Sequence, residues 1–207
     1  MLLAAPLPAA GGSAKPQFIG KASKLDAERR DRMTGRTWHR GCPVPLRQLR
    51  LLRVRHWGFD GDVHRGRLIV HEEETGEVMR ALEDLFRQRF PIRRMEVADA
   101  YGGNDDRLMN ADVTSAFNCR FVAGTHTWSQ HAYGRAIDFN PIENPYVIPS
   151  GHVSPPEGRA YTDRSRDAEG LIKSGSATVR AFKRVGWAWG GNWSGTKDYM
   201  HFSANGR

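Results

Sequence analysis

Two short stretches place histidines and carboxylates at the spacings that a metal site would use. In residues 129–138, Ser-Gln-His-Ala-Tyr-Gly-Arg-Ala-Ile-Asp, His131 and Asp138 lie seven positions apart. Near the end of the sequence, Asp198 precedes His201 by three positions. We expect the rest of the chain to form a scaffold and a substrate wall around these two stretches.

The donor set is that of a catalytic zinc site. Such sites take three protein ligands from His, Asp, Glu and Cys, and they leave a fourth position for water. His131, Asp138 and His201 supply this set. Because a spacing of seven does not stack two side chains as well as a helical spacing of four, we expect Gly134 to turn the chain before Asp138 enters a strand. The sequence therefore predicts one zinc ion above a sheet.

Asp198 is the candidate general base. Hydrolysis of an amide needs a group that takes a proton from the attacking water. On a regular strand, residues three apart point to opposite faces. A turn or bulge must therefore separate Asp198 from His201 if both serve one site, and a regular strand through both positions would contradict the assignment.

The pattern Ser-x-His-x-x-Gly-x-Ala-x-Asp, followed much later by Asp-x-x-His-Phe, resembles the zinc peptidases that cut the peptide stems of bacterial cell wall. These include VanY-type D-alanyl-D-alanine carboxypeptidases, the VanX dipeptidase and L-alanyl-D-glutamate endopeptidases of bacteria and phages, with the hedgehog signalling domain as a distant relative. The resemblance covers residues 43–207. It implies zinc on His131, Asp138 and His201, with Asp198 as general base. It also implies an α+β fold in which helices flank a small central antiparallel sheet.

The resemblance extends to residues around the ligands. It implies that Ser129 braces the first ligand loop from the second coordination shell. We place Ser115, Tyr133 and Trp189 in the same shell or in the wall around a stem peptide. For the aromatic residues, packing in the core is the competing interpretation.

An arginine is expected to stabilise the anionic intermediate. The family places it just after a Ser-Gly-Tyr/Phe turn, whereas this chain reads Ser-Ala-Phe-Asn-Cys-Arg from Ser115 to Arg120. Arg120 is therefore the candidate, displaced by two positions.

The second motif bears on which bond is cut. The carboxypeptidase and dipeptidase branches place Glu before a Trp-His pair, whereas Asp198-Tyr-Met-His201 is closer to the endopeptidase branch. Our hypothesis is a metallopeptidase acting on peptidoglycan stem peptides, with a preference for L-alanyl-D-glutamate endopeptidase activity. A D-alanyl-D-alanine carboxypeptidase is the alternative, and a non-catalytic zinc-containing binding module is the alternative of another class. We expect a bacterial or phage protein that is secreted or associated with the cell wall.

Hydrophobic periodicity and turn residues predict the main elements. We expect two strands, 49–57 and 67–71, joined by a glycine-containing turn, and then an amphipathic helix over 78–90 that is stopped by Pro91. Two further strands are expected over 92–97 and 113–121, followed by a long proline-containing loop over 140–163. The last expected elements are a helix over 177–185, ended by Gly186, and a strand over 198–203.

The beginning of the chain differs in composition from the rest. We divide the chain into residues 1–42, a flexible leader or signal remnant with a basic arm, and a peptidase domain over 43–207. The first 14 residues are apolar and small without a basic residue ahead of them, so a secretory signal remnant and a flexible leader remain alternatives. Residues 13–40 are expected to be an exposed arm with at most one short helix. No apolar run reaches the ~18 residues of a membrane-spanning helix.

The net charge and the two cysteines limit which partners and which cysteine chemistry the sequence predicts. The formal net charge of +8 falls on residues 1–95, so this half could meet an anionic cell-wall polymer, although a solvated surface is the simpler interpretation. We expect no nucleic-acid partner, and the sequence does not indicate an oligomeric state. Cys42 and Cys119 form no Cys-x-x-Cys pattern. A disulfide is their simplest use, and two buried free thiols are the alternative.

Overall fold

The structure is a computed structural model that describes residues 15–207. The leader or signal remnant expected over residues 1–14 lies outside this range. The helices are α1 (Ala27–Met33), α2 (Thr75–Arg87), α3 (Asp105–Asn110) and α4 (Ala177–Arg184). The strands are β1 (Gly20–Lys24), β2 (Leu49–Trp57), β3 (Val63–His71), β4 (Arg94–Met95), β5 (Val113–Thr114), β6 (Ala136–Asp138), β7 (Tyr146–Val147), β8 (Val153–Ser154), β9 (Ala188–Trp189), β10 (Lys197–Asp198) and β11 (His201–Ser203).

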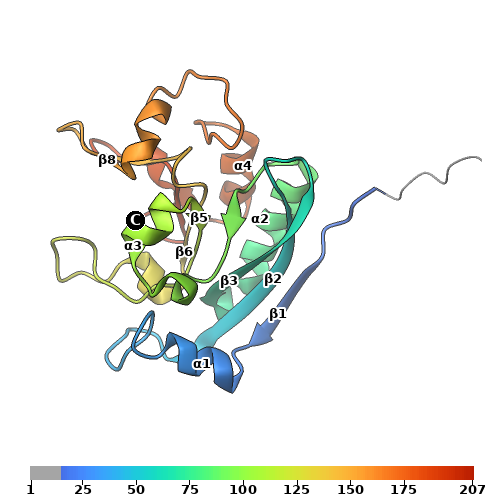
Figure 1. Ribbon diagram of the computed structural model, residues 1–207, viewed down its shortest axis with the longest axis vertical. Helices are drawn as coiled ribbons and strands as arrows, with labels where there is room; N and C mark the ends of the chain where they lie inside the picture. The colour runs from blue at the N-terminus through green and yellow to red at the C-terminus, as the bar shows by residue number, and fades with distance from the viewer. Residues whose placement is uncertain (1–14) are drawn as a thin grey trace, which may run out of the picture.

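A long antiparallel hairpin, β2–β3, forms one side of the molecule (Figure 1). Strand β2 has the bounds that the sequence predicts, whereas β3 begins four residues earlier than expected. Gly66 therefore lies in the strand and not in the turn. A β-carbon at Gly66 would lie 2.6 Å from Met95, so the glycine allows β4 to approach β3 closely. The expected turn is confined to residues 58–62.

The amphipathic helices pack on this hairpin and on the second half of the chain. Helix α2 confirms the predicted helix and starts three residues before the expected position. Ser176 caps α4 by accepting a hydrogen bond from the Val179 N–H at 3.4 Å, and Gly186 follows it with φ 85°. The core joins both helices to β2, β3, β6, β9 and β11, with stacked and edge-on aromatic rings at its centre, Phe139, Phe182 and Phe202.

The α+β class is confirmed. The antiparallel pairing is divided among three small sheets, with the strand orders β1-β2-β3, β10-β7-β8 and β6-β11-β9, while β4 and β5 form a parallel pair. The sheet β6-β11-β9 carries two of the predicted metal ligands, on β6 and β11. Its residues Ile137, Trp189 and Phe202 share one hydrophobic core with residues of α2 and α4.

The expected strand over residues 113–121 is wrong beyond Thr114. From Ser115 onward the backbone bonds to several elements in succession and not to one neighbouring strand. Phe117 N–H donates to the Ile69 carbonyl at 3.0 Å, and Asn118 N–H donates to the His131 carbonyl at 3.2 Å. This segment therefore ties the hairpin to the first ligand loop.

The structure also corrects the length of one expected strand and the content of the expected long loop. The strand expected over 92–97 is limited to β4, because only Arg94 and Met95 pair with β5. The loop expected over 140–163 contains β7, β8 and a 3₁₀ helix, Pro156–Tyr161. Strand β7 pairs with β10, so this segment supports the stretch that contains Asp198.

The exposed arm expected over residues 13–40 is confirmed in part over its described residues. Strand β1 pairs with β2 along its outer edge (Figure 1), and α1 follows it directly. Leu25 and Met33 are buried in a second hydrophobic cluster, although the segment has few apolar residues. Most of the described residues of this segment are exposed and it contains one short helix, as expected. Strand β1 was not expected, because it is polar and gains its order from pairing with β2.

A buried ion pair fastens α1 to the short 3₁₀ helix Ala98–Tyr101. The Arg29 guanidinium donates to the Asp99 carboxylate at 2.7 Å, and their side chains are 7 % and 3 % exposed. Replacing Arg29 by alanine leaves the Asp99 charge buried without its partner. We expect Arg29→Ala to lower the free energy of unfolding by about 3–5 kcal/mol, measured by urea denaturation.

The matched control is Arg32→Ala on the same helix. Arg32 pairs with Glu28 at the surface, with side chains 49 % and 75 % exposed. Its loss should cost less than about 1 kcal/mol. Equal destabilisation by both variants would contradict the importance of the buried pair.

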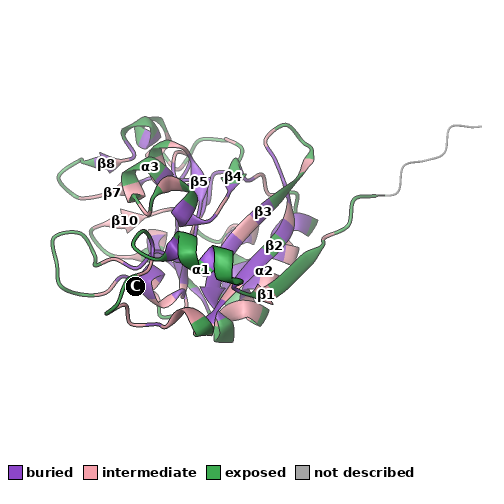
Figure 2. Cartoon of the chain, turned by 60° about the horizontal axis from the view of Figure 1, so that its bottom comes forward, coloured by how far each residue is buried: buried purple, intermediate pink, exposed green. Residues whose placement is uncertain are grey.

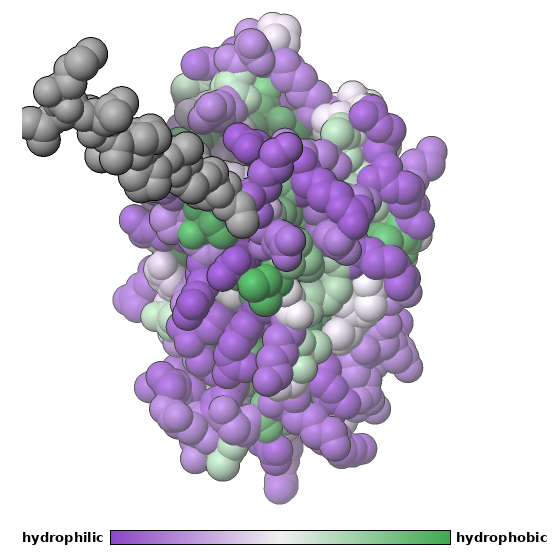
Figure 3. Space-filling model, turned by 90° about the vertical axis from the view of Figure 1, so that its right-hand side faces the viewer, coloured by the Kyte–Doolittle hydropathy of each residue, from purple (hydrophilic) through white to green (hydrophobic). Residues whose placement is uncertain are grey.

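Burial follows this architecture (Figure 2). Buried residues concentrate in β2, β3, α2 and the inner strands, whereas the long connections at the periphery are exposed. The face seen in Figure 3 is mostly hydrophilic with small hydrophobic areas between polar side chains. Within residues 15–207, none of the helices has the length and apolar character needed to cross a membrane.

Candidate metal centre

The first ligand loop is a short 3₁₀ helix, Gln130–Tyr133, between Ser129 and Gly134. The Ser129 hydroxyl accepts a hydrogen bond from the His131 N–H at 3.3 Å, which caps the turn that carries the histidine. Gly134 has φ 67°, and a β-carbon there would lie 2.6 Å from the His71 nitrogen. The chain turns at Gly134 and then enters β6, as expected.

Strand pairing brings the second and third ligands together. In the antiparallel register of β6 and β11, Asp138 lies directly opposite His201. The Asp138 carboxylate lies between the two histidines: Oδ2 is 3.1 Å from His131 Nε2, and Oδ1 is 3.0 Å from His201 Nδ1. The two ring nitrogens are 3.2 Å apart. The structure therefore assembles all three predicted ligands at one point.

Each imidazole has its other nitrogen bonded to a backbone carbonyl. His131 Nδ1 lies 2.6 Å from the Ala116 carbonyl oxygen, and His201 Nε2 lies 3.2 Å from the Arg207 carbonyl oxygen. Since a carbonyl can only accept, these ring nitrogens carry the proton. The facing atoms, His131 Nε2 and His201 Nδ1, then present lone pairs toward Asp138, which is the second-shell arrangement typical of metal-binding histidines.

The donor set fits a zinc ion. Tetrahedral zinc with bonds of about 2.1 Å places its ligand atoms about 3.4 Å apart. The ligand atoms of His131, Asp138 and His201 all lie within 4.8 Å of one another, and their shortest separations are 3.0–3.2 Å. Two lone pairs that face each other beside a carboxylate are stabilised by a cation between them.

In the chain without metal, the charges of the three groups stabilise one another. Burial alone would raise the pKa of Asp138, but the charges and hydrogen bonds of His131 and His201 outweigh it and hold this pKa well below its usual range. Burial would lower the pKa of His201, but the adjacent Asp138 carboxylate raises it. Asp138 is thus ionised over the physiological pH range.

Asp198 lies on a different strand from His201. Strand β10 ends at Asp198, two residues follow outside any strand, and β11 begins at His201 in another sheet. The break that the sequence requires between the two residues is present. Both side chains lie next to Gly190, because a β-carbon added there would lie 3.0 Å from Asp198 Cβ and 3.3 Å from His201 Cβ. Asp198 and His201 therefore share one side of the site.

The Asp198 carboxyl group is suited to exchange protons. The residue is half-buried, and its Oδ1 atom is buried without a hydrogen-bond partner among the residues that the structure describes. Burial raises the pKa of Asp198 to about 6, and the charges of His201 and His131 oppose the rise. An enclosed carboxyl group with a pKa near neutrality is typical of a general base.

Gly190 is a residue that sequence reasoning missed. A β-carbon there would also lie 2.6 Å from the Asp198 carbonyl oxygen, so the backbone at Asp198 has to move if a side chain is added. Misplacement of a catalytic group by about 1 Å costs about 100-fold in rate. We expect Gly190→Ala to lower kcat by about this factor, measured on a stem-peptide substrate with zinc content checked in parallel.

Gly76→Ala is the matched control, because a β-carbon at Gly76 meets only the Arg80 side chain at 3.6 Å. Its activity should equal that of the wild type. Full activity in Gly190→Ala would show that the placement of Asp198 is unimportant.

Arg120 lies beside the first ligand loop. Its carbonyl accepts a hydrogen bond from the Ser129 N–H at 3.1 Å, and its charge is close enough to lower the pKa of Asp198 slightly. The guanidinium forms an ion pair with Asp105 of α3. Its role toward a substrate stays a prediction.

Three further expected residues have distinct positions. Ser115 exchanges backbone hydrogen bonds with Asp138, at 3.1 and 2.9 Å, and so braces that ligand. Tyr133 is half-buried and packs against the second hydrophobic cluster. Trp189 is 3 % exposed and cannot line a substrate wall. Its indole N–H donates to the Tyr199 carbonyl at 2.8 Å, which holds the break between β10 and β11.

The sequence held little signal for the remaining site groups. The Ala116 and Arg207 carbonyls that orient the histidines are backbone atoms, which every residue carries. Gly190 was visible only as part of a Gly-Gly pair, and such a pair has many uses. Its role follows from contacts with residues 198 and 201, which the sequence does not show.

Comparison with known proteins bears on the second half of the chain. Residues 123–204 match the family model described as D-alanyl-D-alanine carboxypeptidase. This range includes the three candidate metal ligands, Asp198 and Gly190. No curated protein and no solved structure matches the chain.

Proposed function

We propose that this chain, whose residues 123–204 match the D-alanyl-D-alanine carboxypeptidase family model, is a zinc-dependent metallopeptidase that hydrolyses an amide bond in peptidoglycan stem peptides. The observation that carries the proposal is the convergence of His131, Asp138 and His201 beside the enclosed carboxyl group of Asp198. A zinc ion on these ligands would polarise the scissile carbonyl and lower the pKa of a water nucleophile to about 7.

The chain's own residues supply the proton transfers. In the proposed reaction Asp198 accepts a proton from the attacking water through its carboxylate. It then donates that proton to the nitrogen of the leaving amine, which returns the carboxylate to its ionised form. Arg120 donates hydrogen bonds to the oxyanion that forms from the carbonyl oxygen. Ser129, Ser115 and Trp189 position the ligand loop, Asp138 and the Asp198–His201 break.

The bond that is cut distinguishes two candidate activities. The Asp-x-x-His spacing favours an L-alanyl-D-glutamate endopeptidase. The description of the matched family favours a D-alanyl-D-alanine carboxypeptidase. A non-catalytic zinc-binding module is a third candidate of another class, and an intact Asp198 beside the ligands argues against it.

The proposed substrate suggests where the protein acts. A peptidase of cell-wall peptides fits an extracellular or cell-wall location. The basic half offers a contact for an anionic wall polymer, since a hollow of about 430 Å³ is lined by Lys24, Arg30, Arg47 and Arg50 with one acid, Glu72. We propose no nucleic-acid partner.

Mass spectrometry of a synthetic pentapeptide stem tests the proposal. The zinc-loaded wild type is incubated with the peptide beside Asp198→Ala. Fragments cut between L-alanine and D-glutamate identify the endopeptidase, and free D-alanine with a tetrapeptide identifies the carboxypeptidase. Intact peptide in both reactions, with one zinc ion per chain, would support the binding module instead.

Arg120 gives a further prediction. Losing an oxyanion donor typically costs about 100-fold to 1000-fold in rate. We expect Arg120→Ala to lose activity by this factor in a steady-state peptide assay while it still binds zinc. Asp105→Asn is the control, because it removes the charge of the partner and leaves the guanidinium in place, so it should keep most of the activity. Wild-type turnover in Arg120→Ala would remove Arg120 from the mechanism.

A further inference from the structure

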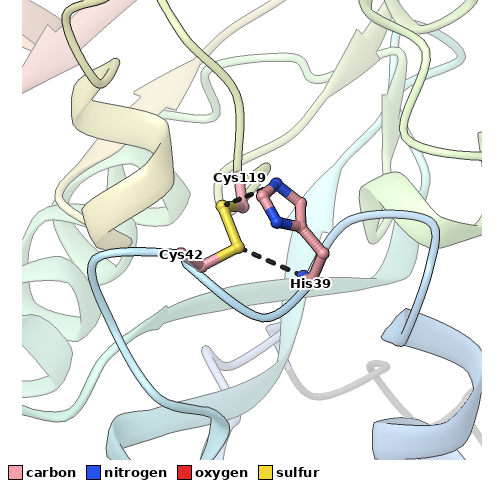
Figure 4. A group of neighbouring side chains, drawn as sticks. All are labelled: His39, Cys42 and Cys119. Atoms are coloured by element: carbon pink, nitrogen blue, oxygen red, sulfur yellow. Dashed lines mark hydrogen bonds between the residues drawn. A yellow bond between two sulfur atoms is a disulfide. The ribbon is translucent and has the colours of Figure 1, made fainter.

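A second cluster of metal-binding residue types lies apart from the candidate metal centre. His39, Cys42 and Cys119 each offer a ligand atom, and these atoms lie within 4.8 Å of one another. Cys42 and Cys119 are joined by a disulfide, and the His39 ring lies beside it (Figure 4). His39 Nε2 is 3.8 Å from Cys119 Sγ, and the His39 N–H donates to Cys42 Sγ at 3.2 Å.

The His39 ring is oriented as a metal ligand would be. Its Nδ1 lies 3.0 Å from the Arg40 carbonyl oxygen, so this nitrogen carries the proton and donates it. Nε2 is then left with a lone pair that faces Cys119 Sγ. A histidine that donates one N–H to a backbone carbonyl and presents its other nitrogen to a soft ligand set is the second-shell arrangement seen at zinc sites.

Contacts other than the disulfide keep the two cysteines together. Cys119 N–H donates to the Thr37 carbonyl at 2.9 Å, and Cys42 N–H donates to the His39 carbonyl at 3.1 Å. The Trp38 indole N–H donates to the Val44 carbonyl at 2.9 Å, which closes the loop around residue 42. Cys119 belongs to the second hydrophobic cluster, and Cys42 packs against it. The thiols would therefore stay close to each other and to His39 after reduction.

We propose that the reduced chain binds a second zinc ion through His39 Nε2 and the thiolates of Cys42 and Cys119. A dithiol reductant breaks the Sγ–Sγ bond, supplies two electrons and two protons to the cysteines, and becomes a disulfide itself. Binding of Zn²⁺ then releases the two thiol protons to solvent. Zinc–sulfur bonds of about 2.3 Å require the sulfurs to separate to roughly 3.8 Å, and the exposed side of His39 leaves room for water as the fourth ligand.

The disulfide and this second site exclude each other. The oxidised chain presents no thiolate, because Cys42 and Cys119 are the only two cysteines of the sequence. The oxidation state of one cysteine pair thus sets whether the chain binds one zinc ion or two. This inference does not depend on the proposed peptidase activity.

Zinc stoichiometry and a cobalt spectrum test the proposal on the full chain. We measure bound zinc by elemental analysis after gel filtration, with and without a phosphine reductant. A phosphine is used because, unlike a dithiol, it does not compete with the protein for zinc. We expect about one zinc ion per oxidised chain and about two per reduced chain. In the reduced chain, Co²⁺ should give a thiolate-to-cobalt charge-transfer band, which His131, Asp138 and His201 cannot produce.

Two variants assign the second ion. His39→Ala keeps the disulfide, so its oxidised form should fold as the wild type does, and its reduced form should bind the second zinc at least about tenfold more weakly. His126→Ala, another exposed histidine, is the control and should bind as the wild type does. Unchanged stoichiometry on reduction, no charge-transfer band, or a second zinc ion retained by a Cys42→Ser/Cys119→Ser chain would overturn the proposal.

Discussion

Replacing Asp198 by asparagine is expected to lower kcat by about 100-fold to 10,000-fold, the range that general-base catalysis contributes. Asparagine has nearly the same shape as aspartate, but it cannot take a proton from water. The ligand atoms of His131, Asp138 and His201 are not altered, so zinc content should stay at one ion per chain. The measurement is steady-state hydrolysis of a stem peptide with zinc determined on the same preparation.

The pH dependence gives this variant a second readout. Burial raises the pKa of Asp198 to about 6 in the chain without metal, and a bound cation would lower it. The base must be ionised, so wild-type activity should rise with pH through an acid limb at or below about pH 6. This limb should be absent from the residual activity of Asp198→Asn.

The stability of the variant separates catalysis from folding. The folded pKa of Asp198 lies above the 3.8 of an unperturbed aspartate, so its ionisation costs stability as the pH rises through about 6. Without metal, Asp198→Asn should therefore be at least as stable as the wild type at pH 7. Asp106→Asn, an exposed acid on α3, is the control for both readouts. An Asp198→Asn enzyme with normal kcat would contradict the assigned base.

Replacing His201 by alanine is expected to remove both metal and activity. His201 Nδ1 is 3.0 Å from Asp138 and 3.2 Å from His131 Nε2, so its loss leaves two ligands where catalytic zinc needs three. Metal ions supply several kcal/mol of transition-state stabilisation, which corresponds to roughly 1000-fold or more in rate. We therefore expect His201→Ala to keep less than about one-thousandth of the wild-type activity and to lose its zinc during gel filtration.

Metal replacement and a control histidine sharpen this result. Chelation of the wild type should reproduce the activity loss, and added Zn²⁺ should restore activity to the wild type but not to His201→Ala at the same concentration. His64→Ala is the control, because His64 pairs with Asp60 at the surface. Wild-type zinc binding by His201→Ala would contradict the assigned ligand set.

The ligands could be predicted because their residue types and spacing are informative in themselves. His131, Asp138 and His201 carry lone pairs or charge, and Gly134 marked the turn between the first two. The structure brings them together through one strand register, Asp138 opposite His201. The requirement for a break after Asp198 followed from strand geometry alone, and the structure has that break.

The support for the site could not be predicted in the same way. Trp189 was placed around the ligands or in the substrate wall, with core packing as the competing interpretation, and the structure buries it where it fixes the Tyr199 carbonyl. Strand β1 has no apolar alternation, and it becomes ordered only because β2 offers it an unpaired edge. The run after Thr114 reads as a strand from its residues, yet its hydrogen bonds go to the β3 and His131 segments. These features depend on contacts between residues distant in sequence.

The position of the metal ion tests the account most directly. Crystals of the zinc-loaded chain with the Cys42–Cys119 disulfide intact are measured on both sides of the zinc absorption edge, and the anomalous difference locates the ion. We predict one peak within bonding distance of His131 Nε2, Asp138 and His201 Nδ1, with the Asp198 carboxylate facing the open coordination position. A peak elsewhere, or one bound through His201 Nε2 after a rotation of the ring, would contradict the site described for this chain.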